Sequence, residues 1–248
     1  MDLQADSVQA VAFMAPGQQQ RTALQLWEAL FPGDAPDSFQ RATGSTPSLA
    51  SNAAGARDGH NIMITSQVGR IDIFLGKVPS ADDAGPPRIA DVQAAVTRAA
   101  GFLRVTADRV APVRIALVLD LSKSIEGGME STSLMELLPG VGIPPDATDV
   151  TLQFNVRRAF GVASEIGMNR LCSWAHAQIG MMTTPMMPGQ LMQIPMANMK
   201  FTPIVNVKID VNSAPEARLS SDLVPALIEE LRVEALAIYE EGFARLQA

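Results

Sequence analysis

The stretch Ile204-Val-Asn-Val-Lys-Ile-Asp-Val-Asn212 carries the clearest structural pattern in this chain of 248 residues. Its apolar and polar side chains alternate, which predicts a strand with one face in the core and the other facing solvent. A helical pattern follows from Asp222 to Leu246, where Asp222 can cap the first turn and Pro225 needs no backbone donor. The predicted buried stripe of this helix consists of Leu227, Leu231, Ala235, Ile238 and Tyr239. Its predicted solvent face consists of Glu229, Glu230, Glu234, Glu240 and Glu241.

The segments upstream alternate between the two-residue period of strands and the spacing of amphipathic helices. The pattern predicts strands at residues 8–14, 113–121, 150–156 and 171–179, and a hairpin across residues 62–75. Helices are predicted at residues 18–31 and 89–103, with a helical turn at 134–138. Small and turn-forming residues predict a loop over residues 38–60 and a linker over residues 79–87.

This order of elements predicts an α+β fold, with mainly antiparallel sheets, helices packed on one side and a long C-terminal helix. Each half of the chain ends in a helix that follows strands. We therefore expect an N-terminal unit over residues 1–108 and a C-terminal unit over residues 109–248.

Composition narrows the environment and the partners. Hydrophobic residues make up 47% of the chain and charged residues 18%, enough apolar material for a sizeable core. No apolar run approaches the roughly 18–20 residues that cross a bilayer, so we expect no membrane span. The acidic start, Met1 to Asp6, lacks the features of a secretory signal, and Cys172 has no second cysteine to pair with, which favours the cytoplasm. The formal charge of −7 and the scattered basic residues argue against nucleic-acid binding.

The sharpest local motif is Asp120-Leu-Ser122-Lys-Ser124, which has the form D-x-S-x-S after an apolar strand. It resembles the metal-ion-dependent adhesion motif of von Willebrand factor A-type domains. The resemblance implies that Asp120, Ser122 and Ser124 hold a divalent cation, usually Mg²⁺, through hard oxygen ligands. That family has a parallel, doubly wound sheet, whereas the strands predicted after this motif leave little room for crossover helices. The alternative is a strand end whose polar side chains cap a turn.

Eight of the 13 methionines fall between Met168 and Met199, among prolines that forbid a regular helix. Methionine side chains adapt to different surfaces, so this run predicts an apolar loop that binds a protein partner or a second copy of the chain. The residues expected to make this contact are Met181, Met182, Met186, Met187, Met192 and Met196. Two alternatives stay open: a loop folded back over the protein's own core, and soft thioether ligands for Cu(I) beside Cys172 and His176.

A few ionisable residues invite a catalytic interpretation. Cys172 and His176 lie four residues apart, and a thiol with an imidazole could form a nucleophilic pair, although a buried structural cysteine is the commoner outcome. His60 follows an Asp-Gly pair at the start of the predicted hairpin. Arg70 and Asp72 are expected to form a solvent-side cross-strand pair.

Several common catalytic signatures are missing from the sequence, including the phosphate loop, the G-x-G-x-x-G turn, the G-x-S-x-G elbow and H-E-x-x-H. We therefore lean towards a protein without enzymatic activity and expect no catalytic residue and no required cofactor. An enzyme whose residues converge in three dimensions remains an alternative.

The C-terminal stretch from Ile204 to Asn212, followed by the Glu-rich helix with Leu227-Ile-Glu-Glu-Leu-Arg, resembles the end of a sporadically distributed family of uncharacterised bacterial proteins. The same ending is similar, more loosely, to the export chaperone SecB. The resemblance implies a bacterial origin and supplies no catalytic residues. The leading hypothesis is a bacterial binding or assembly protein, and the alternatives are a cation-dependent adhesion module and an enzyme with an unrecognised site.

Overall fold

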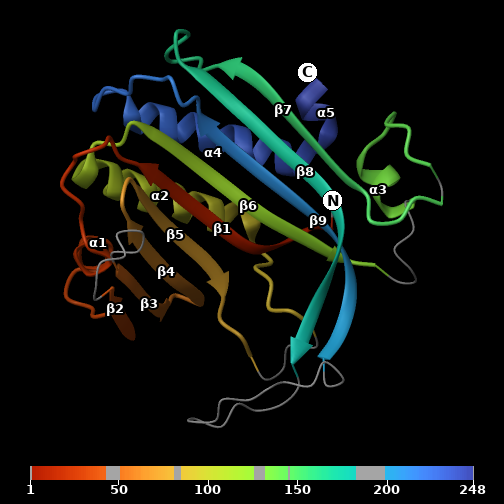
Figure 1. The fold of residues 1–248 in the computed structure, drawn as a ribbon, viewed down its shortest axis with the longest axis horizontal. Helices are drawn as coiled ribbons and strands as arrows, with labels where there is room; N and C mark the ends of the chain where they lie inside the picture. The colour runs from red at the N-terminus through yellow and green to blue at the C-terminus, as the bar shows by residue number, and fades with distance from the viewer. Residues whose placement is uncertain are drawn as a thin grey trace.

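The computed structural model describes residues 2–42, 51–80, 85–125, 132–144, 146–182 and 199–247. Within them, nine strands form one antiparallel sheet in the order β2-β3-β4-β5-β1-β6-β9-β8-β7 (Figure 1). The strands are β1 Gln4–Phe13, β2 Ser38–Arg41, β3 Ser51–Arg57, β4 His60–Gln67, β5 Arg70–Lys77, β6 Arg114–Ser124, β7 Thr151–Ala159, β8 Gly167–Met182 and β9 Met199–Ser213. The helices are α1 Ala23–Leu30, α2 Val92–Val110, α3 Thr132–Leu137, α4 Val224–Glu241 and α5 Phe243–Gln247. The chain is an α+β protein in which the sheet dominates.

The first strand lies in the middle of the sheet. β1 pairs antiparallel with β5 on one side and with β6 on the other. The strands from the first half of the chain therefore continue directly into those from the second half. The main buried cluster likewise contains side chains from both halves, among them Ile73, Val96, Leu117 and Leu231.

Helices cover one face of this sheet. α2 contacts β1, β5 and β6, α4 contacts β6 and β9, and α2 also packs against both α1 and α4. Figure 1 shows α2 and α4 lying side by side behind the sheet. Among the described residues, no helix has the length and hydropathy needed to cross a membrane.

The opposite face of the central strands carries a small apolar cluster of its own, formed by Val11, Ala116 and Val118 with Phe13 packed against it. The guanidinium groups of Arg70 and Arg114 lie 5.1 and 4.9 Å from the centre of the Phe13 ring. Stacked cations of this kind cover apolar carbon while keeping charge on the surface. This face therefore has a small buried apolar centre with arginine side chains beside it.

Helix α1 is shorter than the helix predicted over residues 18–31. It begins at Ala23 because Thr22 forms a capping box with Gln25: the Thr22 hydroxyl accepts from the Gln25 N–H, and the Gln25 side chain accepts from the Thr22 N–H. The preceding Gln18 instead donates its side-chain amide to the carbonyl of Val110, at the end of α2.

The loop predicted over residues 38–60 is wrong in part, because β2 and β3 lie within it. Its small residues serve close packing instead. A Cβ atom on Gly55 would come within 2.9 Å of the Trp27 ring, so this strand position admits glycine only. The Ser51 hydroxyl, also buried, accepts from the Ala23 N–H and ties β3 to the start of α1. Tertiary contacts outweigh the loop-like composition here.

The C-terminal helix is divided at Gly242, whose positive φ of 65° ends α4 and redirects the chain into α5. The predicted cap is wrong, since Leu223 occupies the N-cap position and makes no side-chain cap bond. Pro225 does fall in the first turn, as predicted. Leu227, Leu231, Ala235 and Ile238 are buried, which confirms the central part of the apolar stripe.

Glu234 was predicted to face solvent, but it lies between the sheet and the C-terminal helices. Its carboxylate accepts from Arg170 at 3.1 Å and from Arg245 at 2.7 Å. Burial by itself raises the pKa of Glu234, but the hydrogen bonds and charges of the two arginines outweigh it and hold that pKa below its ordinary value. Arg170, whose side chain is 1% exposed, also donates to the Arg245 carbonyl. The three side chains therefore fasten α4 and α5 to β8.

We expect Glu234→Ala to lower the free energy of unfolding by about 3–5 kcal/mol, because it leaves the Arg170 guanidinium buried without a counter-charge. Urea denaturation followed by the fluorescence of the buried Trp27 and Trp174 measures this loss. Glu229→Ala on the same helix is the control: its carboxylate is half-exposed and pairs with Arg232. That variant should lose less than about 1 kcal/mol. Equal losses in the two variants would contradict the structural role given to the buried triad.

Candidate functional site

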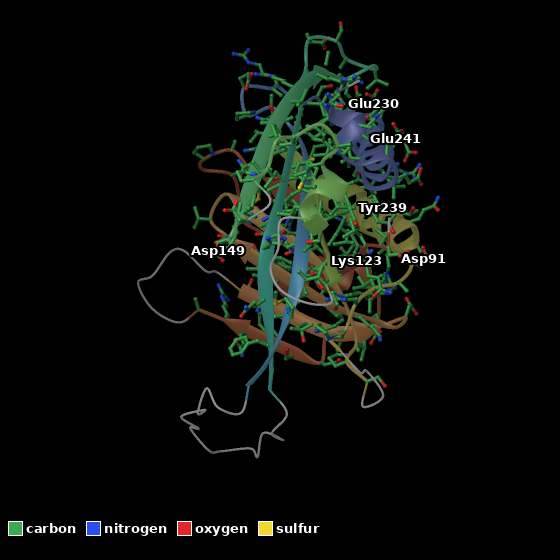
Figure 2. All side chains as sticks on the ribbon, turned by 90° about the vertical axis from the view of Figure 1, so that its right-hand side faces the viewer. Asp91, Lys123, Asp149, Glu230, Tyr239 and Glu241 are labelled. Atoms are coloured by element: carbon green, nitrogen blue, oxygen red, sulfur yellow. The ribbon has the colours of Figure 1, made fainter. Side chains whose placement is uncertain are left out.

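Strands β8 and β9 run on beyond their neighbours in the sheet. The β7–β8 pairing ends at Thr151 with Ala175, and the β6–β9 pairing ends at Ser124 with Ile204. The β8–β9 pairing continues to Met182 with Met199. Residues 177–182 and 199–203 thus form a two-stranded extension, which we call the β8–β9 ribbon, and it spans about 20 Å. Figure 1 shows it leaving the sheet at the lower edge, and Figure 2 shows the same projection from the side.

The β8–β9 ribbon differs chemically from the rest of the surface. Its sequence, Ala177-Gln-Ile-Gly-Met-Met182 and Met199-Lys-Phe-Thr-Pro203, contains one charged residue, Lys200, in a chain with a net charge of −7. Phe201 is 45% exposed and Ile179 is partly exposed. A nearly uncharged hairpin with exposed apolar side chains is typical of a surface that another chain covers.

The structure describes only part of the methionine-rich run. Met181 and Met182 form the end of β8, at the far end of the ribbon. The other residues predicted to bind a partner, Met186, Met187, Met192 and Met196, lie outside the described residues. Met168, at the start of the same run, is buried on the helix-covered face of β8 and belongs to the core.

The D-x-S-x-S residues occupy alternate positions of β6, which continues three residues beyond the predicted end of this strand. Each is hydrogen-bonded to another side chain. The Asn206 amide donates to Asp120 at 2.6 Å, the Ser122 hydroxyl donates to Asp6 at 2.8 Å, and Arg88 donates to Ser124 at 3.1 Å. The sheet around the motif is antiparallel, unlike the parallel sheet that the resemblance implies.

Asp6 is the member of this cluster that the sequence pattern did not identify. It sits where the β1–β6 register shifts, between Ala5 and Ser7, and Arg88 donates to it at 3.3 Å. Burial raises the pKa of Asp6, the Ser122 and Arg88 contacts oppose this shift, and the nearby Asp120 charge adds to it. The described residues contain no group of three or more His, Cys, Asp or Glu side chains placed to hold a metal ion. The cluster offers two carboxylates and two hydroxyls, with a guanidinium already among them.

Cys172 and His176 are both buried on the helix-covered face of β8. Four residues along a strand span about 13 Å, too far for a thiol–imidazole hydrogen bond. Burial also raises the pKa of Cys172 to about 12, so the thiol stays protonated near neutral pH. A nucleophilic cysteine needs the opposite shift. These residues therefore do not form the catalytic pair considered from the sequence.

His176 has a different partner, the Ser133 hydroxyl of α3, which lies 3.1 Å from its Nε2 atom. The Nδ1 atom is buried without a hydrogen-bond partner among the described residues. Burial lowers the pKa of His176, and the charge of Asp149 partly opposes this shift. The imidazole lies beneath α3 at the base of the ribbon, where β7 pairing with β8 ends.

The lowered pKa of His176 predicts a loss of stability as pH falls. Above about pH 6.5 the ring is neutral in both the folded and the unfolded chain; below it the unfolded chain binds a proton that the folded chain resists. The contribution approaches roughly 1.4 kcal/mol per pH unit at most. We expect the pH dependence of the unfolding free energy to be shallower in His176→Gln than in the wild type, in urea titrations from about pH 7.5 to 5. Identical slopes would show that this histidine does not resist protonation.

The remaining candidates have structural partners. His60 lies beside Arg98, whose guanidinium is 3.2 Å from the His60 Nδ1 atom and also binds Asp58 at 2.7 Å. Arg70 and Asp72 do pair, but the predicted cross-strand geometry is wrong, because both residues lie on β5. Asp72 is also buried rather than solvent-facing, and it accepts across the strands from Gln9 at 2.5 Å.

Comparison of the chain with protein-family models, with curated proteins and with solved structures found no match. The fold alone therefore defines the class of the protein. It is an α+β protein built on one broad antiparallel sheet. Its resemblance to a bacterial family at the C-terminus stays a prediction.

Proposed function

We propose that this is a bacterial binding or assembly protein that holds a protein partner, or a second copy of itself, through the β8–β9 ribbon. The methionine-rich segment that joins the two ribbon strands in sequence would form part of the same contact. The observation that carries the proposal is the continuation of β8–β9 pairing beyond the strands on either side.

Backbone chemistry supports this function. A two-stranded hairpin has marginal stability in water by itself, and its outer edges carry unpaired N–H and C=O groups that can pair with another strand. The outer edge of β9 is less suited to such pairing at Pro203. This residue has no N–H to donate, and its carbonyl already accepts from the Ile125 N–H. The outer edge of β8 has no proline between Ala177 and Met182, so it is the better edge for an added strand.

Side-chain chemistry points to the same surface. Two copies of a chain with net charge −7 repel each other on average, and the ribbon, whose one charged residue is Lys200, adds no negative charge to this repulsion. Phe201 offers an aromatic anchor, and methionine side chains fit surfaces of different shape at low cost.

We expect Phe201→Ser to weaken the association at least about tenfold, because aromatic anchors near the centre of an interface contribute more than about 1.4 kcal/mol. Replacing residues 183–198 by a short Asn-Gly turn should abolish it. Mass photometry across a dilution series measures self-association, and pull-down from a bacterial lysate followed by quantitative mass spectrometry measures partner capture.

Val233→Ser is the matched control, since Val233 is 50% exposed on α4 and the substitution removes a similar apolar group far from the ribbon. It should leave both readouts unchanged. A wild-type chain that stays monomeric and captures no protein, or ribbon variants that bind as the wild type does, would refute the proposal.

A second candidate is divalent-cation binding by Asp120 and Ser122, and the closeness of Asp6 favours it because a second carboxylate strengthens a site for Mg²⁺. In this interpretation the cation would compete with Arg88 for Asp6. Calorimetry should then show saturable Mg²⁺ binding by the wild type and none by Asp120→Ala. Asp222→Asn, at an exposed carboxylate before α4, serves as the control. Negligible heat from the wild type would remove this candidate.

A further inference from the structure

The two edges of the sheet differ in length and in how they are protected. Strand β2 forms one edge with four residues, Ser38–Arg41, whereas β7 forms the other with nine, Thr151–Ala159. Proteins commonly protect a free edge by making it short or by placing proline or charge on it, because unpaired backbone groups there attract another strand. β7 is long, contains no proline and carries charge only near its end, in Arg157 and Arg158. In Figure 2, which looks onto this side of the sheet, β7 begins beside the labelled Asp149 and the helices lie to its right.

The outward backbone groups of β7 belong to alternate residues. In an antiparallel pair, residues that exchange hydrogen bonds with the neighbouring strand alternate with residues whose N–H and C=O point away from it. The Val150 carbonyl accepts from the His176 N–H, so the even-numbered residues of β7 face β8. No other strand among the described residues pairs with β7 on its outer side. The odd-numbered residues, whose backbone groups point outward, are all exposed, namely Thr151, Gln153, Asn155, Arg157 and Ala159.

The even-numbered side chains make this edge apolar on the helix-covered side. Four of them are only partly buried where they pack against the main buried cluster, namely Val150, Leu152, Phe154 and Val156. The centre of the Phe154 ring lies 6.0 Å from that of Trp174 and 5.1 Å from that of Phe243, so the row is anchored in the core. A strand added at this edge would therefore extend the apolar layer beneath the helices.

We propose that β7 pairs antiparallel with β7 of a second copy of this chain, about a two-fold axis at Gln153. The four apolar residues are symmetric about Gln153, so Val150 lies opposite Val156 of the second copy and Leu152 lies opposite Phe154 of the second copy. A two-fold interface uses the same patch on both chains, so a row that matches its own reverse suits a second copy better than an unrelated strand. The three outward-facing residues nearest the axis then supply about six backbone hydrogen bonds between the copies.

The charges at the ends of β7 favour the same register. Pairing about Gln153 brings the Arg157 end of each strand to the Asp149 end of the other, so opposite charges approach and like charges are kept apart. Arg157 also pairs with Glu216, but its side chain is 51% exposed, which leaves donors for a second carboxylate. Moving the axis towards the C-terminus would instead set Arg158 opposite an apolar residue and break the match of the apolar row.

Cysteine cross-linking tests the axis directly. Gln153→Cys places two thiols across it, where the Cα atoms of a hydrogen-bonded pair lie about 5.5 Å apart, within the range of a disulfide. We expect a disulfide-linked dimer on a non-reducing gel after mild oxidation with copper phenanthroline. The wild type should form none, because its one cysteine, Cys172, is fully buried.

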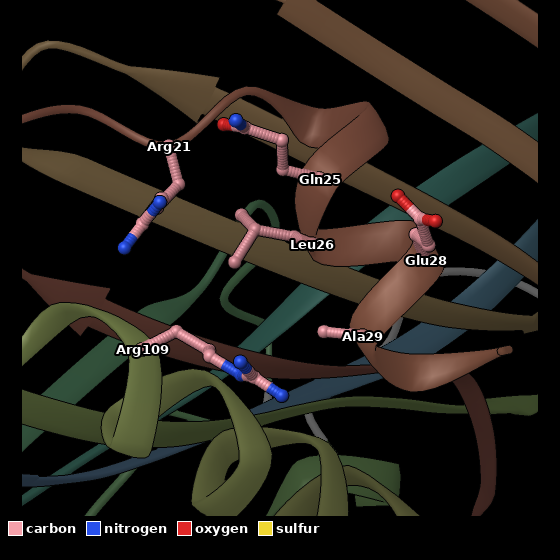
Figure 3. A pocket seen from close by; sticks show the side chains of 6 residues that line it. All are labelled: Arg21, Gln25, Leu26, Glu28, Ala29 and Arg109. Atoms are coloured by element: carbon pink, nitrogen blue, oxygen red, sulfur yellow. The ribbon is translucent and has the colours of Figure 1, made fainter.

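Two exposed positions serve as controls for the cross-link. Asn155→Cys lies on the same strand, but in this register the two Asn155 positions are four residues apart, about 13 Å. Glu28→Cys, on α1 beside the cavity shown in Figure 3, measures cross-linking by random collision. Both should form at least about tenfold less dimer than Gln153→Cys, since a disulfide requires close Cα atoms. No dimer from Gln153→Cys, or an equal yield from Asn155→Cys, would overturn the proposal.

Gln153→Pro tests the backbone pairing, because proline removes the outward N–H of this position while the even-numbered residues keep their bonds to β8. Mass photometry across a dilution series should show dimerisation at least about tenfold weaker than in the wild type, since both hydrogen bonds at the axis are lost. Gln153→Ala keeps the N–H and should dimerise as the wild type does. Thermal unfolding checks that both variants fold, and equal dimerisation by the two would contradict strand pairing.

Phe201→Ser separates this contact from the proposed function. The cross-link through Gln153→Cys should form equally well in the Phe201→Ser background, because Phe201 belongs to the β8–β9 ribbon and not to β7. A cross-link lost with Phe201→Ser would assign the contact to the ribbon and overturn pairing through β7. A cross-link that persists while Phe201→Ser leaves partner capture unchanged would count against the ribbon alone.

Discussion

The hydrogen bonding of β1 to both β5 and β6 is the constraint on which the rest of the structure depends. It joins residues near position 10 to residues about 60 and 100 positions later, so the two halves of the sheet are held together by pairing between distant parts of the chain. Once β1 is placed, its alternation puts Val8, Ala10 and Ala12 under the helices and Val11 on the other face. The apolar faces of β5 and β6 follow, and α2 crosses behind all three strands.

Charge is distributed differently in the two layers of the molecule. Beneath the helices, Arg170 and Glu234 form a buried ion pair. Removing the two charges from water costs free energy, which their mutual attraction offsets only when the two groups are correctly placed. On the open face, the partly exposed Arg70 pairs with the buried Asp72 beside the small apolar cluster around Val11.

The proposed binding surface rests on backbone pairing and apolar contact. The ribbon presents backbone edges and apolar side chains in a region almost without charge, which suits a protein strand. At the base of the ribbon, His176 contacts the Ser133 hydroxyl of α3. Burial there lowers the pKa of His176, so the fold disfavours the protonated ring.

Local patterns in the sequence were enough to predict most strands, the α2 helix, the apolar stripe of α4 and the α+β class, because two-residue and helical periods report directly which side chains are buried. The same patterns located the polar run on β6 and the methionine-rich segment. Only the tertiary structure decided that β1 lies at the centre of the sheet, that the glycine- and alanine-rich residues 51–57 form a strand against Trp27, and that Glu234 faces Arg170. It also decided that Asp6 joins Ser122. These features depend on residues far apart in the chain, and periodicity reports burial but not which distant side chain fills the space.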